Sequence, residues 1–160
     1  MRVFAALMAL LMGLSGTGLT LEEEIAETLG VQAQTGEIVY ADDSHAGFHG
    51  DGEAFVILEF EEDDELIRSV EENARWHALP MNEAERLLVY GGRKDGVFHG
   101  AVVSALVPEV EEGWYRLIDR HHLAGDEADA EQMMERYSYN LTLGIYDAAR
   151  KRLYYVEVDT

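Results

Sequence analysis

The carboxyl-terminal third of the chain limits the fold more than any other part. Residues 137–146 alternate between larger apolar side chains and small or polar ones, a period of two that is typical of a strand with one buried and one wetter face. Residues 147–151 provide a tight connection, and the Tyr- and Val-rich run 153–158 predicts a second strand. The pair predicts an antiparallel hairpin, which a strand over 113–119 extends into a meander.

Another strand is expected in the first half of the chain. Residues 53–60 read EAFVILEF and are apolar on both faces of an extended backbone. This pattern predicts a strand that is covered on both sides. A shorter strand is expected over 36–41, where Ile38, Val39 and Tyr40 favour β structure.

Helix signals lie between these strands. Thr20 and Glu23 form the pattern of a capping box, which marks the first turn of a helix. Apolar residues then recur at helical spacing over 21–29, and Gly30 is placed to end the helix. Two further helices are predicted, over about residues 63–75 and from Asn82, as N-cap, through Tyr90.

These elements predict the α+β fold class. A chain of 160 residues has the size of one domain, and it shows no internal repeat or linker. We therefore expect a single domain over residues 19–160, with a mostly antiparallel sheet, helices packed on one face and a C-terminal β-hairpin.

The first 18 residues have the order of a secretory signal peptide. Arg2 supplies the positive charge, residues 3–14 form an apolar run, and small residues follow up to Gly18. The run is shorter than the about 20 apolar residues that span a bilayer. Residues 1–18 are therefore predicted to be a signal peptide or an N-terminal membrane anchor of an extracytoplasmic protein, secreted or membrane-tethered; a core helix is the remaining alternative.

Composition excludes several functions. The chain has 12 Lys and Arg against 32 Asp and Glu, a net charge of -20, which disfavours binding to nucleic acid or to anionic lipid. Zero Cys excludes disulfides, thiol catalysis and Cys-bound metal clusters. No phosphate-binding loop, nucleophile elbow or EF-hand loop occurs in the sequence.

The densest group of chemically active residues lies in the segment 42–52, DDSHAGFHGDG. It contains the candidate functional residues Asp43, His45, His49 and Asp51. Imidazole and carboxylate are metal ligands, so His45 and His49 are the candidates for a divalent metal site, although no cofactor is predicted. In an extended segment the two His residues would lie about 13 Å apart, so only a hinged loop would bring them to one ion.

Two other interpretations of this segment stay open. It is either a Gly-rich turn, in which Asp and Gly serve backbone geometry, or a functional loop without metal. Asp119 and His121 lie two positions apart in the strand expected near 113–119 and its continuation, and would share a face. They form a candidate supporting pair, either structural or catalytic.

The segment 43–52 resembles the D-T-H-G-G-F-H-G-D-G stretch of small bacterial proteins with signal or lipoprotein leaders, whose activity is uncharacterised. The ending YNLTLGIYDAARKRLYYVEVDT, residues 139–160, resembles theirs too. The resemblance implies an exported bacterial protein and assigns no activity. The chain differs from the pattern at Ser44 and Ala46, and Thr17 stands where a lipobox would have its Cys.

We therefore expect a non-enzymatic binding or accessory protein that meets a protein or small ligand outside the cytoplasm. One alternative is a metal-dependent or acid–base hydrolase centred on residues 43–51. Another is an inhibitor or immunity-like protein whose acidic face covers a basic target.

Overall fold

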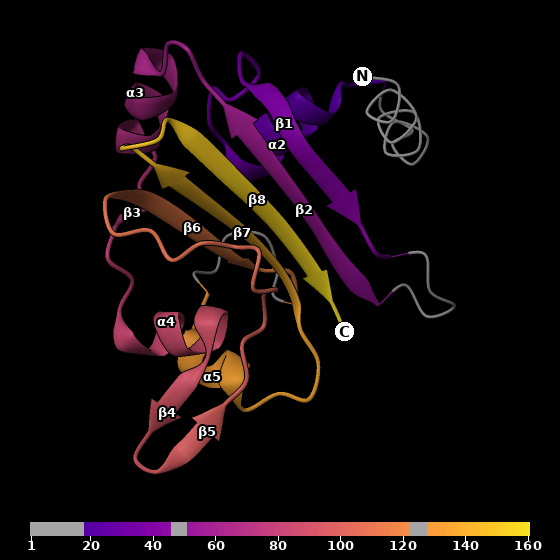
Figure 1. Cartoon of the computed structure of the whole chain (residues 1–160), viewed down its shortest axis with the longest axis vertical. Coiled ribbons are helices and arrows are strands. Elements are labelled where there is room, and N and C mark those ends of the chain that lie inside the picture. Colours follow the sequence, from indigo (N-terminus) through magenta and orange to yellow (C-terminus); the bar gives the residue numbers. More distant parts are fainter. Residues whose placement is uncertain (1–17, 46–50, 122–127) are drawn as a thin grey trace.

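The structure, a computed structural model, describes residues 18–45, 51–121 and 128–160. The described residues form a six-stranded sheet in the order β1-β2-β8-β7-β6-β3, in which all neighbouring strands are antiparallel (Figure 1). The strands are β1 (Glu37–Asp43), β2 (Gly52–Glu59), β3 (His77–Ala78), β6 (Gly113–Asp119), β7 (Asn140–Asp147) and β8 (Arg152–Asp159). Two short strands, β4 (Gly92–Lys94) and β5 (Val97–His99), form a separate ribbon.

One helix precedes β1, and the other three described helices lie in connections between strands. The described helices are α2 (Leu21–Leu29), α3 (Asp64–Glu72), α4 (Glu83–Tyr90) and α5 (Ala130–Met134). The predicted capping box of α2 is present, and Gly30 ends the helix in the left-handed conformation with φ 62°. A second capping box opens α4, between Asn82 and Glu85.

The predicted meander and α+β domain are confirmed. In the hairpin, Leu143 pairs with Val156, and β6 lies on the other side of β7 with Gly113 opposite Asp147. The central strand expected over 53–60 is β2, whose two neighbours are β1 and β8. Its residues 54–56 are all buried, as a strand covered on both sides requires.

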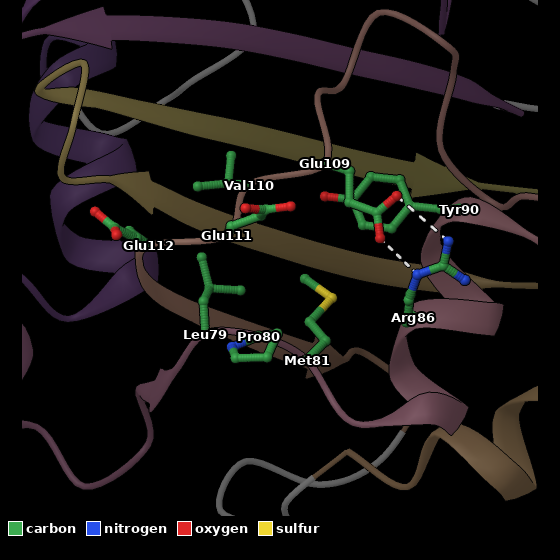
Figure 2. Close-up of a pocket in the computed structure, with 9 residues that line it drawn as sticks. All are labelled: Leu79, Pro80, Met81, Arg86, Tyr90, Glu109, Val110, Glu111 and Glu112. Atoms are coloured by element: carbon green, nitrogen blue, oxygen red, sulfur yellow. Dashed lines mark hydrogen bonds and ion pairs between the residues drawn. The ribbon is translucent and has the colours of Figure 1, made fainter.

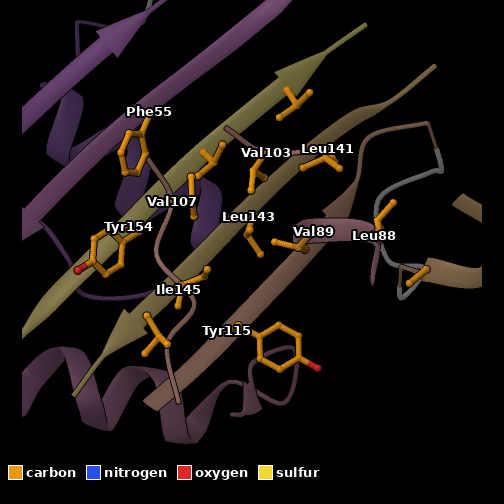
Figure 3. Packing of buried hydrophobic residues seen from close by; sticks show 14 of the residues in the cluster. Phe55, Leu88, Val89, Val103, Val107, Tyr115, Leu141, Leu143, Ile145 and Tyr154 are labelled. Atoms are coloured by element: carbon orange, nitrogen blue, oxygen red, sulfur yellow. The ribbon is translucent and has the colours of Figure 1, made fainter. Parts of the chain in front are cut away.

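Helices lie on both faces of the sheet, where the sequence led us to expect them on one. α2 and α3 pack on one face, which we call the α2–α3 face. α4, α5 and residues 102–110 pack on the other, the α4–α5 face, with the core shown in Figure 3. Two covered faces explain why β2, β7 and β8 carry apolar side chains in both directions.

β7 shows the consequence most clearly. The expected wetter face is buried, because Thr142 and Tyr146 point to the α2–α3 face and are both 0% exposed. Gly144 lies between them, and a Cβ there would come within 2.9 Å of the Leu29 side chain of α2. The small residues in the alternating pattern therefore make room for a helix rather than facing water.

Buried polar groups fix the α2–α3 face. Asp63, 8% exposed, accepts a hydrogen bond from the Tyr146 hydroxyl and lies 3.0 Å from Lys151 Nζ. Burial acts to raise the pKa of Asp63, but the hydrogen bonds from Tyr146 and Lys151 outweigh it and the pKa is lowered. The Asp63 carboxylate, at the start of α3, is thus held in its ionised form.

The end of α2 is held by a buried cation. Arg116 of β6 and the Trp76 indole donate hydrogen bonds to the carbonyl of Leu29, at 2.6 and 3.0 Å. A cation at a helix C-terminus complements the partial negative charge of the last carbonyls. Burial and neighbouring Arg75 lower the pKa of Arg116.

The predicted signal peptide or N-terminal anchor covers residues 1–18, of which residues 1–17 lie outside the described part of the chain. Among the described residues, the helices are too short or too polar to cross a bilayer.

Candidate functional site

Five of the six residues predicted from the sequence border one end of the sheet. Asp43 ends β1 and His45 follows it, and Asp51 immediately precedes β2. Asp119 ends β6 and His121 follows it. The register places these strand ends beside Asp159 at the end of β8, because Gly52 and Asn140 both pair with that residue. The sixth candidate, His49, lies outside the described residues.

His45 is held between two carboxylates. Its Nδ1 lies 2.6 Å from Asp43 Oδ1, and the same oxygen accepts its backbone N–H at 2.9 Å. On the other side of the ring, Nε2 lies 3.2 Å from Asp159 Oδ2. Ser44 adds a clamp to β2, since its hydroxyl donates to the Glu53 carbonyl and accepts from the Glu53 N–H. The segment after β1 is thereby tied to β2 and β8.

Arg120 extends this network along β8. Its guanidinium donates to Asp159 Oδ1 at 2.8 Å and to the Val158 carbonyl at 3.1 Å, and lies 3.6 Å from Glu157. Glu157 in turn accepts the Tyr155 hydroxyl at 2.5 Å. Burial, and then the nearby Glu157 charge, raise the pKa of Tyr155, so this phenol stays a hydrogen-bond donor.

The second predicted pair, Asp119 and His121, makes a different contact from the one expected. Asp119 accepts a hydrogen bond from the backbone N–H of His121 at 3.1 Å and pairs with Arg136 at 2.7 Å. The contact between the two residues therefore uses the main chain of His121. The ion pair between Asp119 and Arg136 anchors the end of β6 to the segment that follows α5.

The geometry at His45 is closed. A general base must offer its free ring nitrogen to the proton that it removes. Here Nδ1 faces Asp43, and Nε2 is buried 3.2 Å from Asp159 Oδ2, without a hydrogen-bond partner among the described residues. Within the described ranges, no three His, Asp or Glu side chains are grouped to hold a metal ion.

The structure also contains a cleft beside α4 that the sequence analysis did not predict. We call it the α4 cleft; it has a volume of about 480 Å³ (Figure 2). One wall is residues 79–81, the other is residues 109–112, and α4 closes one end. Its lining residues are Leu79, Pro80, Met81, Arg86, Tyr90, Glu109, Val110, Glu111 and Glu112.

Two contacts hold the end of the cleft next to α4. Arg86 Nε lies 2.5 Å from Glu109 Oε1, with a second, longer contact of 3.4 Å to the other oxygen. The Tyr90 hydroxyl donates to the Pro108 carbonyl at 2.8 Å. Burial, with Glu109 adding to it, raises the pKa of Tyr90 and keeps the phenol protonated. Residues 108–109 are thus fixed to α4.

The sequence held only a weak signal for this cleft. Residues 91–113 are the least regular stretch of the sequence, with one possible strand near 97–103. The cluster Glu109, Glu111 and Glu112 stands beside a single apolar residue, Val110. Val110 is 7% exposed. A buried residue among exposed carboxylates indicates an irregular segment that packs against the core. It does not indicate that this segment lies opposite residues 79–81.

Charge is unevenly distributed over the described surface. Seven Lys or Arg side chains of the described residues lie within 4 Å of a carboxylate. α2, in contrast, carries four Glu and no basic residue. We call the exposed carboxylates of α2, α3 and the turn before α3 the acidic helical surface: Glu23, Glu27, Glu61, Glu62, Asp64, Glu65, Glu71 and Glu72. Two exposed cations, Arg68 of α3 and Arg75 just after it, lie beside these eight carboxylates.

Comparisons with protein-family models, with curated proteins and with solved structures find no match to the chain.

Proposed function

We propose that the chain is an exported, non-enzymatic binding domain that recognises a basic protein partner outside the cytoplasm. The observation that carries the proposal is the acidic helical surface. Eight exposed carboxylates on one layer create a field that attracts a cationic surface and speeds its encounter.

The distribution of the cations supports this proposal. Seven Arg and Lys side chains of the described residues are paired with carboxylates, as in Arg120 with Asp159 and Arg152 with Glu59. Their charge is therefore largely neutralised locally. The excess negative charge of the chain, -20, remains on surfaces such as α2 and α3.

The closed network at His45 also favours binding over catalysis. Asp159 and Asp119 at this end of the sheet are engaged with His45, Arg120 and Arg136. Each of these contacts joins segments that are distant in sequence, so their common effect is to stiffen the sheet end. An inhibitor or immunity-like protein is one form that such a binding role takes.

Export is part of the proposal and rests on residues 1–18. If these residues are a signal peptide, the mature protein recovered outside the cytoplasm begins at Leu19. Intact-mass measurement of the native protein, with cell fractionation, tests this. A full-length protein in the membrane fraction would indicate a retained anchor, and one confined to the cytoplasm would contradict export.

The binding role is tested by capture from the extracytoplasmic fraction followed by reconstitution. The full chain is used as bait at low salt, and each recovered protein is purified and titrated separately. We expect a basic partner whose affinity falls steeply from about 0.01 M to about 1 M salt, over which the Debye length shrinks from about 30 Å to about 3 Å.

The same experiment separates the alternatives. A partner that is an active enzyme or toxin, and loses activity on binding, would give the protein an inhibitory role. A partner of acidic or neutral surface, bound with an affinity that salt does not change, would contradict the proposal.

A further inference from the structure

The α4 cleft combines an apolar floor with an acidic rim. Leu79, Pro80 and Met81 on one wall face the segment 109–112 on the other (Figure 2). Between them Val110 is buried, whereas Glu111 and Glu112 are exposed. A ligand in the cleft would therefore meet apolar atoms at its depth and carboxylates at its mouth.

The negative charge at the mouth is not neutralised within the cleft. Its one cation, Arg86, is taken up by Glu109, which it contacts through both Nε and Nη2. Within the described part of the chain, the side chains of Glu111 and Glu112 make no hydrogen bond or ion pair with another residue. Two carboxylates are thus left to attract a cation.

We propose that the α4 cleft receives a lysine or arginine side chain of the basic partner. This inference rests on the proposed function and assigns the partner's anchoring residue. The methylene stem of such a side chain covers apolar surface while its charged head stays at the rim. A volume of about 480 Å³ lies within the range of small-ligand sites, about 300–1,000 Å³.

Charge selects this occupant over others. An anionic group would be repelled by Glu109, Glu111 and Glu112. A wholly apolar group would cover Glu111 and Glu112 without offering them a donor, which is unfavourable for carboxylates. An alkyl cation offers apolar contact to the floor of the cleft and a positive charge to the carboxylates at its rim.

The test uses n-butylguanidinium as the probe, titrated into the full isotope-labelled chain and followed by NMR. We expect shifts of the amide signals of Leu79, Met81 and residues 109–112. Affinity should rise by up to about fourfold for each methylene added from the ethyl to the butyl compound, because each buries apolar surface. Uncharged n-pentanol should bind at least about tenfold more weakly, since it lacks the charge-assisted hydrogen bonds.

Two matched variants assign the charge effect to the cleft. Glu111→Gln with Glu112→Gln removes two exposed carboxylates at the cleft, and Glu71→Gln with Glu72→Gln removes two exposed carboxylates at the end of α3. We expect the first pair to weaken butylguanidinium binding by about tenfold or more. The second should change it by less than about twofold, because exposed distant charges are screened.

Four results would overturn the inference: no binding of butylguanidinium, equal binding of n-pentanol, a flat chain-length series, or the same loss in both double variants. The alkyl series needs no mutation, so it decides the question even if a variant folds poorly. If butylguanidinium does not bind while the partner complex stays salt-dependent, only the cleft assignment fails. If the complex proves independent of salt, the proposed function fails as well.

Discussion

Asp63 shows how a single side chain connects charge to stability. It is buried next to Tyr146 and Lys151, and its pKa is lowered in the folded protein because their hydrogen bonds outweigh the burial that would raise it. A carboxyl whose folded pKa lies below the unfolded value stabilises the fold above the unfolded pKa, about 3.9 for Asp. The stabilisation is lost as the pH falls through the folded pKa.

The first prediction concerns Asp63→Asn. Losing a buried charged acceptor should lower the free energy of unfolding at pH 7 by about 1–3 kcal/mol. The difference from the unsubstituted protein should shrink below about pH 4, where the unfolded carboxyl protonates. Urea titrations across pH measure this, with the exposed Asp64→Asn as control. A difference that does not change with pH would refute the explanation.

His45 gives a second prediction at the residue scale. His45→Ala removes the imidazole that lies between Asp43 and Asp159. The two carboxylates then lose their contact with the ring. We expect a loss of about 1–2 kcal/mol in unfolding free energy, and no change in partner affinity. Denaturant unfolding and binding titrations of His45→Ala beside His121→Ala, whose side chain is exposed, check this. Normal stability with abolished binding would show that His45 belongs to the binding site.

At the scale of elements, the approach of β6 to β7 depends on Gly113. This residue has φ 137°, and a Cβ there would lie 1.9 Å from the Tyr146 carbonyl oxygen. Gly96, in the β4–β5 turn, also has a positive φ, 80°, but a Cβ there would meet nothing within 4 Å. A substitution at Gly96 therefore meets backbone strain alone, whereas the same substitution at Gly113 also meets a steric clash with β7.

A third prediction follows for these glycines. Gly96→Ala should cost about 1–2 kcal/mol, the strain of a left-handed conformation. Gly113→Ala should cost more than about 4 kcal/mol, because the strands must also separate. Thermal unfolding of both variants measures the difference. Similar midpoints would mean that β6 is not paired to β7 in this register.

The sequence predicts elements well where periodicity and capping agree. The bounds of α2 were predicted as they occur, because a capping box and a glycine mark its two ends. β7 was predicted as a strand, but its second face was expected to be wet. Alternation shows which residues share a face, whereas covering of that face by α2 depends on contacts distant in sequence.

The same limit applies to the candidate site. The closeness of Asp43 and His45 could be inferred from their spacing, since they are two positions apart. The contact with Asp159 could not, because it depends on strand order and register. The α4 cleft brings residues 79–81 to 109–112 through irregular backbone, for which the sequence offers no period.

At the scale of the whole molecule, the carboxylates that give the charge of -20 lie in three settings. Some are paired inside the fold, such as Asp63, Asp119 and Asp147. Others lie on the acidic helical surface, where water and salt reach them. A third group, such as Asp42 and Asp95, is exposed elsewhere on the molecule. The acidic helical surface should contribute most of the salt dependence of partner binding, because buried pairs are screened much less and the third group lies outside the proposed interface.

The most direct test of the binding role is therefore the salt dependence of partner affinity in two charge-matched variants. One variant carries Gln at Glu23, Glu27, Glu65 and Glu72 of the acidic helical surface; the other neutralises exposed Asp42, Asp95, Glu131 and Glu135 elsewhere. We predict that the slope of log Kd against log salt concentration flattens in the first variant and stays nearly unchanged in the second. Equal slopes in both variants and in the unsubstituted protein would contradict recognition of a basic partner by α2 and α3.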